Sequence, residues 1–343
     1  MNRKMNAALI THYKQEYPTI ETVDMPKIGA NDVLVKIVAA SINPIDLKTK
    51  DGGLKMLLKY HMPLILGSDF AGVVTEVGAK VTTFKKGDAV YGRVQKNRIG
   101  TFAEYIAVDQ GDIARKPQNL SFEEAAAVPL VGLTSYQALH DIMQIQPGQR
   151  VLIQAGSGGI GTIAIQLAKQ MGAYVATTTS EKNRALVESL GADEVIDYRT
   201  QQFYDVLENY DYVFDTQGGK ILEQAFRIIK PGGKVVSISG LPNARFADEY
   251  NVPFWKKFAF RLVTRNITKL EKTTQADYYF LFMKPSGQQL AILSRMIEEE
   301  KIHPVIDRVL PFTQIAQAFE YSHSGRAKGK IILKMFDPSV EHE

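Results

Sequence analysis

Four glycines in the stretch Gln154–Thr162 (QAGSGGIGT) are spaced in a way that suits the binding of a phosphate group. Gly156, Gly158 and Gly161 fit the pattern G-x-G-x-x-G, which is also typical of a simple structural turn. Here an apolar run that predicts a strand precedes the pattern, and a helical pattern and a second strand follow it. Glycines let the backbone approach a pyrophosphate closely, and the N–H groups at the start of the helix attract its charge. The context therefore predicts a dinucleotide-binding turn.

The end of the second predicted strand bears on which dinucleotide binds. NAD sites usually place Asp or Glu there for the ribose 2′-hydroxyl, and such a carboxylate would repel a 2′-phosphate. Here residues 177–180 are Thr, Thr, Thr and Ser, followed by Glu181 and Lys182. We interpret Ser180 and Lys182 as phosphate contacts and Glu181 as facing solvent, which predicts NADPH. An inward-pointing Glu181 would favour NADH, and Lys182 could instead be a solvated lysine at a helix start.

Residues that could ligate a metal are scarce. The chain has no cysteine, so disulfides and thiolate metal sites are excluded. Its six histidines, at positions 12, 61, 140, 303, 323 and 342, show no metal-ligand spacing. Zinc needs three or four nitrogen or sulfur ligands at once, so we predict that no metal is bound.

Charge and hydropathy exclude several classes of partner. The net charge of +4 is spread along 343 residues, and the basic spots Lys85–Lys86 and Lys256–Lys257 are short, so we predict no nucleic-acid partner. No apolar run approaches the ~18 residues of a membrane span, and the start of the chain lacks a signal-peptide core. We therefore predict a cytoplasmic protein with no membrane partner.

Two kinds of patterning divide the chain. Residues 1–125 contain short β-branched and aromatic runs bounded by turn residues, and Ser121 with Glu124 forms a capping box that opens a helix. From residue 150 strands alternate with helices, which predicts βαβ units and a parallel sheet. The tail after residue 300 returns to short strands, which we expect to fold back onto the N-terminal β-rich region. The stretch 243–276 shows no clean period.

Five motifs carry a resemblance to a known family. They are LGSDFAGVVTEVG (66–78), FKKGDAVYG (84–92), AAAVPLVGLTSYQAL (125–139), LIQAGSGGIG (152–161) and LGADEVIDY (190–198). In this order they resemble the medium-chain dehydrogenase/reductase superfamily. The resemblance implies an α/β protein with a GroES-like, β-rich catalytic domain (1–127 and 285–343). It also implies a Rossmann domain with a doubly wound parallel sheet that binds NADP (128–284).

The resemblance points to a zinc-independent branch of the superfamily. Zinc-dependent members bind the metal through a Cys, the His of a G-H-E motif and a later Cys. Here these positions fall at or near Asn43, at Gly67–Ser68–Asp69 and near Leu130. The segment NPIDLK (43–48) is similar to that of plant enone oxidoreductases and chloroplast quinone oxidoreductases. This implies NADPH-dependent reduction of small α,β-unsaturated carbonyls or quinones.

The resemblance also implies roles for individual residues. Asn43 and Lys48 would line the nicotinamide and substrate pocket, and Thr134 would bind on the nicotinamide side. Independently of the resemblance, Ser239 and Gly240 stand at the end of the predicted strand KVVSIS, at the carboxyl end of the sheet, so we expect them to flank the nicotinamide. The pyrophosphate would be held by Gly156, Ser157, Gly158, Gly159, Ile160 and Gly161. The adenosine 2′-phosphate would meet Ser180, Lys182 and Tyr198.

Catalysis would depend on a donor at the carbonyl oxygen, because negative charge develops there when hydride adds to the β-carbon. Lys48 is the first candidate, and Tyr60 is either a second donor or a packing tyrosine. Asp46 could orient Lys48 or cap the local turn. The α-carbon proton would come from water.

Two alternative functions stay open, and a second copy of the chain is the predicted partner. The chain could reduce quinones alone, or it could be a non-catalytic NADPH-binding protein of the crystallin type. The run YYFLFM (278–283) predicts a strand at the edge of the Rossmann sheet, where members of the superfamily commonly pair across a two-fold axis. We therefore predict a homodimer.

Overall fold

The computed structural model describes residues 3–55 and 57–335 of the chain. Its contacts divide the chain into two compact units: unit 1 comprises Met1–Leu133 and Lys284–Glu343, and unit 2 comprises Thr134–Met283. The first boundary lies inside helix α3 (Pro129–Tyr136). The sequence-based boundary at residue 128 precedes this helix, which begins at Pro129.

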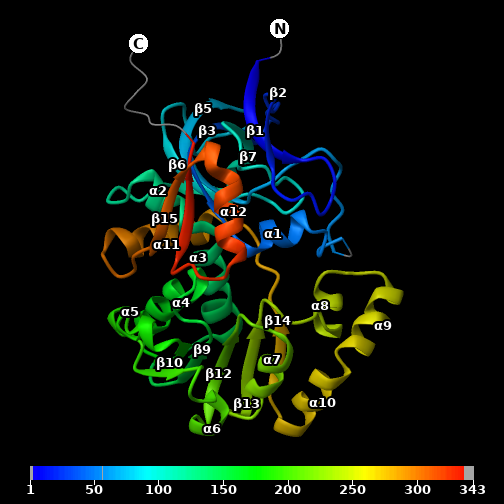
Figure 1. Ribbon diagram of the computed structural model, residues 1–343, viewed down its shortest axis with the longest axis vertical. Helices are drawn as coiled ribbons and strands as arrows, with labels where there is room; N and C mark the ends of the chain where they lie inside the picture. The colour runs from blue at the N-terminus through cyan, green and yellow to red at the C-terminus, as the bar shows by residue number, and fades with distance from the viewer. Residues whose placement is uncertain (1–2, 56, 336–343) are drawn as a thin grey trace. The chain divides into compact units, whose positions relative to one another are not determined.

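Unit 2 is built on a six-stranded sheet whose order is β11-β10-β9-β12-β13-β14 (Figure 1). All neighbouring strands are parallel. The strands are β9 (Arg150–Ile153), β10 (Tyr174–Thr179), β11 (Glu194–Asp197), β12 (Tyr210–Asp215), β13 (Ile229–Ser237) and β14 (Asp277–Phe280). Because β9 is first in the chain, the order is the 3-2-1-4-5-6 of doubly wound folds, and the predicted fold class is confirmed.

Helices cover this sheet, and its central strand is buried on both faces. Every residue of β12 is buried, as expected for a central parallel strand. Helix α4 packs on β9 and β10, and α7 packs on β12 and β13. After the end of α3, the helices of unit 2 are the π-helical η2 (Gln137–Met143), α4 (Gly159–Gln170), the 3-10 helix η3 (Glu181–Asn183), α5 (Arg184–Ser189), α6 (Phe203–Val206), α7 (Gly219–Ala225), α8 (Ala244–Glu249), α9 (Phe254–Val263) and α10 (Arg265–Thr274).

Unit 1 is β-rich. Its larger sheet has the order β15-β16-β3-β5-β6-β8, with β7 also paired to β3, and its smaller sheet has the order β2-β1-β4. The strands are β1 (Lys4–Ile10), β2 (Thr19–Asp24), β3 (Asp32–Ile42), β4 (Leu64–Ile65), β5 (Asp69–Val77), β6 (Ala89–Arg93), β7 (Tyr105–Asp109), β8 (Ile113–Arg115), β15 (Ile306–Pro311) and β16 (Lys330–Lys334). The helices are α1 (Pro44–Lys50), η1 (Gln110–Asp112), α2 (Phe122–Ala126), α11 (Gly287–Glu298), η4 (Phe312–Gln314) and α12 (Ile315–His323).

The C-terminal strand closes the larger sheet of unit 1. β16 pairs antiparallel with β3, so that Ile331 lies opposite Ile42, and parallel with β15. The buried core joins apolar residues of β3 and β5 to Phe312 and Phe319 from the same C-terminal segment. The tail therefore folds back onto the N-terminal β-rich region, as the sequence predicted.

Three elements differ in extent from the sequence-based expectation. Residues 100–108 (GTFAEYIAV) form one of the β-branched and aromatic runs of the N-terminal region, but their strand, β7, begins only at Tyr105. Residues 133–143 (LTSYQALHDIM) have helical spacing, and they form the end of α3 together with the wider turn of η2. The strand expected at 278–283 ends at Phe280, because its neighbour β13 ends at Ser237, the partner of Phe280.

Candidate functional site

The glycine-rich turn joins β9 to α4 and is held in a close-packed form. It opens at Ala155, whose φ of 53° lies in the left-handed region. A Cβ atom on Gly156 would lie 2.2 Å from Thr177 Oγ1, and one on Gly161 would lie 2.5 Å from the Ala155 carbonyl oxygen. Helix α4 begins after Gly158, which offers no side chain to cap it, so its first N–H groups are left for another acceptor. These features fit a pyrophosphate.

Ser157 in this turn is fixed by two side chains from the next βα unit. Its Oγ accepts hydrogen bonds from Thr179 Oγ1 at 2.9 Å and from Asn183 Nδ2 at 3.0 Å. Asn183 Oδ1 is buried and has no partner among the described residues. Asn183 was not among the predicted site residues, although its place just beyond the end of β10 marked it as a residue near the turn.

The carboxyl ends of β10 and β11 bring the predicted 2′-phosphate contacts together. The register pairs Thr179 with Asp197, and the Tyr198 N–H donates to the Thr179 carbonyl oxygen at 3.2 Å. Ser180 is buried at the end of β10, whereas Lys182 and Tyr198 are exposed. Arg199, which the sequence analysis missed, has its guanidinium 5.9 Å from the centre of the Tyr198 ring.

Glu181 lies beside these residues. Its carboxylate accepts hydrogen bonds from Arg184 Nε at 3.0 and 2.9 Å, and its side chain is 65% exposed. It is neutralised by Arg184 at the start of α5. Because Arg184 is paired with Glu181, the cations nearest in sequence that remain for the predicted 2′-phosphate are Lys182 and Arg199.

The ends of β12 and β13 are tied together by a buried carboxylate. Asp215 accepts hydrogen bonds from the Ser237 hydroxyl and from the Gln217 and Gly218 N–H groups at 3.0 and 2.9 Å. Burial raises the pKa of Asp215, and these donors oppose the shift. The predicted site residues Ser239 and Gly240 follow, with Gly240 N donating to Ser237 Oγ at 2.8 Å. Asp215 was not predicted as a site residue from the sequence, although it stands at the end of a predicted strand, where ligands bind in sheets of this type.

Thr134 and Gln154 are the remaining groups near the turn. Thr134 is buried in α3, and the hydroxyl of the adjacent Ser135 donates to the Ile160 carbonyl oxygen at 3.5 Å. The carboxamide of Gln154, at the end of β9, is buried, and neither its oxygen nor its nitrogen has a partner among the described residues. Unit 2 thus gathers its predicted contacts at the carboxyl edge of the sheet, where doubly wound folds bind ligands.

The predicted catalytic residue Asn43 belongs to a buried polar cluster in unit 1. Its Nδ2 donates to Asp69 Oδ2 at 3.0 Å, and its Oδ1 accepts from the Lys330 ammonium. Lys330 also donates to the Ile42 carbonyl oxygen at 3.2 Å and lies 3.8 Å from Asp69 Oδ2. The side chain of Asn43 is therefore committed to joining β3, β5 and β16.

Asp46 extends the same cluster. Its Oδ2 accepts the Asn43 N–H at 2.8 Å and caps α1, and its Oδ1 accepts from Ser68 Oγ at 3.3 Å. The sequence left two roles open for Asp46, orienting Lys48 or capping the local turn, and in the structure Asp46 caps α1. Burial raises the pKa of Asp46 to about 7, and the nearby Asp69 carboxylate adds to the shift.

Stability should therefore depend on the protonation of Asp46. Its pKa is about 7 in the folded protein and 3.8 without burial, so between these values the folded protein binds more protons than the unfolded chain. The free energy of unfolding should then fall as the pH rises through this range, by at most about 1.4 kcal/mol per pH unit. Urea unfolding at several pH values should show a shallower decline in Asp46→Asn. An equal decline in both proteins would assign the dependence to another group.

The residues at the zinc positions of related dehydrogenases do not fit a zinc ion. Asp69 is hydrogen-bonded to Ser41 and Asn43 beside an ammonium group, and Ser68 is bonded to Asp46. No group of three or more His, Cys, Asp or Glu in the described part of the chain could hold a metal ion. We derive no step through a metal.

Lys48 and Tyr60, the other predicted catalytic residues, lie elsewhere in unit 1. Lys48 is an exposed residue of α1, and no described side chain pairs with its ammonium. The Tyr60 hydroxyl donates to the Lys96 carbonyl oxygen at 2.7 Å. Burial raises the pKa of Tyr60 to about 12, so its hydroxyl keeps its proton.

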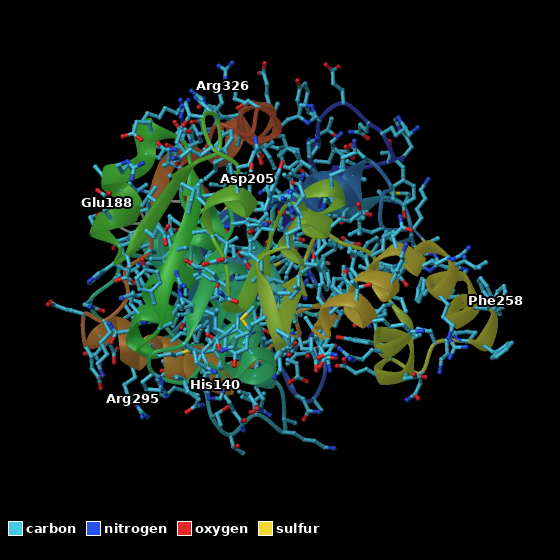
Figure 2. All side chains as sticks on the ribbon, turned by 90° about the horizontal axis from the view of Figure 1, so that it is seen from below. His140, Glu188, Asp205, Phe258, Arg295 and Arg326 are labelled. Atoms are coloured by element: carbon cyan, nitrogen blue, oxygen red, sulfur yellow. The ribbon has the colours of Figure 1, made fainter. Side chains whose placement is uncertain are left out.

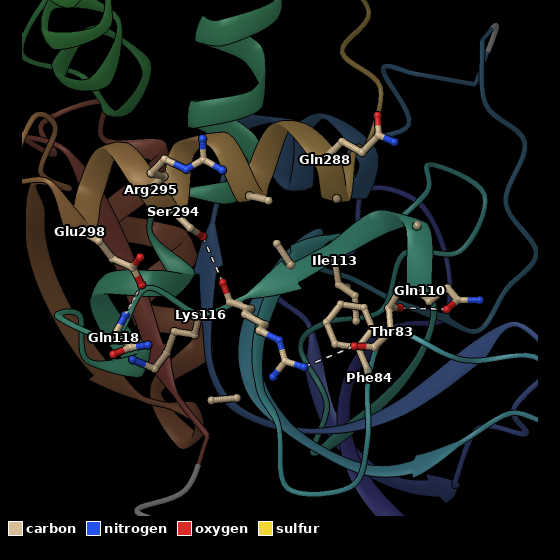
Figure 3. Close-up of a pocket in the computed structure, with 16 residues that line it drawn as sticks. Thr83, Phe84, Gln110, Ile113, Lys116, Gln118, Gln288, Ser294, Arg295 and Glu298 are labelled. Carbon is tan, nitrogen blue, oxygen red and sulfur yellow. Dashed lines mark hydrogen bonds between the residues drawn. The ribbon is translucent and has the colours of Figure 1, made fainter.

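A separate groove of about 820 Å³ lies in unit 1 between α11 and the β8 region (Figure 3). Its polar groups largely satisfy one another: Ser294 Oγ donates to the Arg115 carbonyl oxygen at 3.0 Å, and Glu298 accepts from the Gln118 N–H at 2.9 Å. None of the predicted site residues lines it, so it is not part of the candidate site.

Comparisons with known proteins agree with this architecture. A family model described as "Alcohol dehydrogenase GroES-like domain" matches residues 29–118, and one described as "Zinc-binding dehydrogenase" matches residues 190–333. The chain is 36% identical to a 2-methylene-furan-3-one reductase of Solanum lycopersicum, over 91% of this chain and 74% of the relative. It is 35% identical to a chloroplastic NADPH-dependent alkenal/one oxidoreductase of Arabidopsis thaliana, over 90% of this chain and 73% of the relative.

A solved structure gives the same result. The quinone oxidoreductase from Coxiella burnetii is 31% identical and superposes with a TM-score of 0.83, over 97% of this chain and all of that one. The GroES-like assignment and the family resemblance are therefore confirmed. The chain belongs to the medium-chain dehydrogenase/reductase superfamily, in the branch of quinone oxidoreductases and enone reductases, and it is an oxidoreductase.

Proposed function

We propose that the protein uses NADPH to reduce the conjugated double bond of small α,β-unsaturated carbonyl compounds. The observation that carries the choice of cofactor is the carboxyl end of β10, where Ser180 and Lys182 replace the usual acidic residue and Glu181 is paired with Arg184. The names of the two plant relatives, a 2-methylene-furan-3-one reductase and an alkenal/one oxidoreductase, support the choice of substrate.

The chain's own residues would bind the cofactor and stabilise the charge that develops on the substrate. A bound reduced nicotinamide would supply the hydride. The turn Gly156–Gly161 would hold the pyrophosphate, and Thr134, Ser239 and Gly240 would contact the nicotinamide end. Lys48 would donate to the carbonyl oxygen as it becomes an enolate, and water would supply the proton to the α-carbon. Asn43 and Asp46 would position the start of α1, which carries Lys48.

The proposed reaction is tested by NADPH absorbance with a vinyl ketone and, in parallel, an ortho-quinone. We expect faster turnover of the vinyl ketone, and a fall in kcat of about 10²–10³ in Lys48→Met, because one well-placed donor contributes that much. Lys50→Met is the matched control, because Lys50 lies on the same helix and its ammonium is already bonded to Asp51. Turnover of the quinone alone would make the protein a quinone reductase. Tight NADPH binding without turnover would favour the non-catalytic alternative.

The cofactor preference should reside in Lys182 and Arg199. Each would form a charge-assisted bond with a 2′-phosphate, so Lys182→Ala and Arg199→Ala should each raise the KM for NADPH roughly 10- to 100-fold. The KM for NADH should stay unchanged, because NADH lacks that phosphate. Arg326→Ala removes an exposed cation from unit 1 and serves as the control. Equal effects on both cofactors, or a wild-type preference for NADH, would contradict this assignment.

We also propose a homodimer formed by pairing of the edge strand β14, and a cytoplasmic location. Within the described residues, no helix has the length and apolar character needed to cross a membrane. β14 is the last strand of the sheet. The Tyr278 N–H donates to the Glu271 carboxylate at 2.8 Å and its carbonyl oxygen accepts from the Arg245 guanidinium at 2.9 Å, so a partner strand would have to displace these side chains. Sedimentation at micromolar concentration tests the dimer, and cell fractionation tests the location.

A further inference from the structure

Helix α9 exposes an unusual amount of apolar surface. Phe254 is 81% exposed and is the most exposed large hydrophobic residue described, followed by Trp255 at 64% and Leu262 at 60%. Phe258 is 55% exposed and extends from the outer side of α9 in Figure 2. Exposed apolar residues on a soluble protein are usually scattered singly, so a cluster of this kind indicates a contact surface.

The cluster lies on one side of an anchored helix. Phe254, Phe258 and Leu262 are four residues apart and therefore share a face, which we call the apolar stripe together with Trp255. Phe260, on the opposite face, is buried, and its ring packs edge-to-face with Phe246 of α8 at 6.2 Å. Phe246 in turn contacts Phe280 of β14 at 5.4 Å. The stripe is therefore presented outward by a helix fixed to the sheet.

Cations follow the apolar stripe along the chain. Residues 243–276 contain seven Lys or Arg and three Asp or Glu, a balance of +4 that equals the net charge of the whole chain. Arg265, Lys269 and Lys272 share one face of α10, and Arg261 precedes them on α9. These four side chains are exposed, and none has an ion-pair partner among residues 3–55 and 57–335. Because α10 contacts α9, a cationic surface continues from the helix that carries the stripe and calls for an anionic partner.

The charge decides between possible occupants. A second copy docked here by two-fold symmetry would use the same patch on both subunits, so one cationic surface would face another, which is repulsive. An amphipathic helix with Phe, Trp and Leu on one side and Lys and Arg on the other is typical of helices that lie in a membrane interface. Contrary to the sequence-based prediction of no membrane partner, we propose that α9 and α10 dock on an anionic lipid surface, with the apolar stripe entering the headgroup region and the α10 cations facing lipid phosphates.

The only tryptophan of the chain makes a direct test possible, because Trp255 lies in the stripe. The full-length protein is mixed with phosphatidylcholine vesicles, with or without phosphatidylglycerol, and its tryptophan emission and flotation are measured. We expect a blue shift and co-flotation with the anionic vesicles, little of either with neutral vesicles, and weakening at high salt.

Matched variants identify the surface. Arg265→Glu with Lys269→Glu should lower the affinity for anionic vesicles by at least ~25-fold, since each cation near such a surface contributes roughly fivefold. Phe258→Ser with Leu262→Ser should abolish the blue shift while retaining Trp255 as the reporter. Val309→Ser and Arg326→Glu, exposed residues of unit 1, should change neither readout.

Three results would overturn the proposal. They are the absence of binding to anionic vesicles, equal binding to neutral vesicles, and equal losses in the control variants. A blue shift that grows with protein concentration without lipid would instead assign the stripe to a second copy of the chain. Thermal unfolding of each variant checks that the protein remains folded.

Discussion

Replacing Lys330 with methionine should lower the free energy of unfolding by about 3–5 kcal/mol, the usual cost of leaving a buried charge unpaired. The Lys330 ammonium is buried against Asp69 and Asn43. Burial lowers the pKa of Lys330, and the carboxylates of Asp69 and Asp46 oppose this shift. Methionine preserves the volume of the side chain but removes the charge. Urea unfolding followed by far-UV circular dichroism measures the loss.

A second substitution separates charge from packing. Asp69→Asn removes the matching negative charge while keeping an oxygen that can accept from Ser41 and Asn43, so it should restore part of the stability lost in Lys330→Met. If Lys330→Met alone cost less than about 1 kcal/mol, Arg93, the other buried cation of the cluster, would be the effective counter-ion.

Adding a methyl group to the glycine-rich turn should separate its structural role from phosphate binding. A Cβ on Gly161 would lie 2.5 to 2.7 Å from backbone atoms of Ala155 and Gly156, so Gly161→Ala must displace the turn. A Cβ on Gly158 would meet only the Ala155 carbonyl oxygen, at 3.3 Å. We expect Gly161→Ala to lose both stability and dinucleotide binding. Gly158→Ala should keep its stability within ~1 kcal/mol and bind NADPH at least 10-fold more weakly.

Calorimetric titration with NADPH and thermal unfolding of both variants measure the two effects. Loss of binding in Gly158→Ala without loss of stability would mark that glycine as a point of close approach by the ligand. Unchanged NADPH affinity in both variants would reduce the motif to a structural turn, and the proposed cofactor site would then have to be abandoned.

The parallel sheet and its first turn could be predicted from the sequence, because the alternating strand and helix patterns and the glycine motif are each confined to short segments of the chain. Buried runs such as Val151–Ile153 alternate with helical patterns, and the glycines come directly after the strand that presents them. The face of α11 was likewise predictable, since Leu290, Leu293 and Ile297 recur at helical spacing and all are buried. Short edge strands such as β4, with only two residues, carry no such pattern.

The polar cluster of unit 1 could not be predicted in the same way. Lys330 and Asn43 are 287 residues apart, and nothing local in GKIILK marks its first charged residue as a buried cation. A role for Asn43 in the pocket was inferred from its motif, whereas its side chain joins three strands. In residues 243–276, breaks at Asn251 and Thr264 divide the pattern into three short helices, which hides the period of each.

The strand pairing of β16 with β3 has a consequence for how the protein is made. When the first 133 residues have left the ribosome, the carboxylates of Asp46 and Asp69 still lack Lys330. The larger sheet of this unit cannot be completed until the strand that begins at residue 330 has been made. At typical translation rates, roughly 200 residues take about 10 to 40 s. Residues 134–283 form a continuous unit and can fold during that interval. The nascent chain therefore holds an unfinished β-rich segment for many seconds, and this is the stage at which the protein would depend most on chaperones.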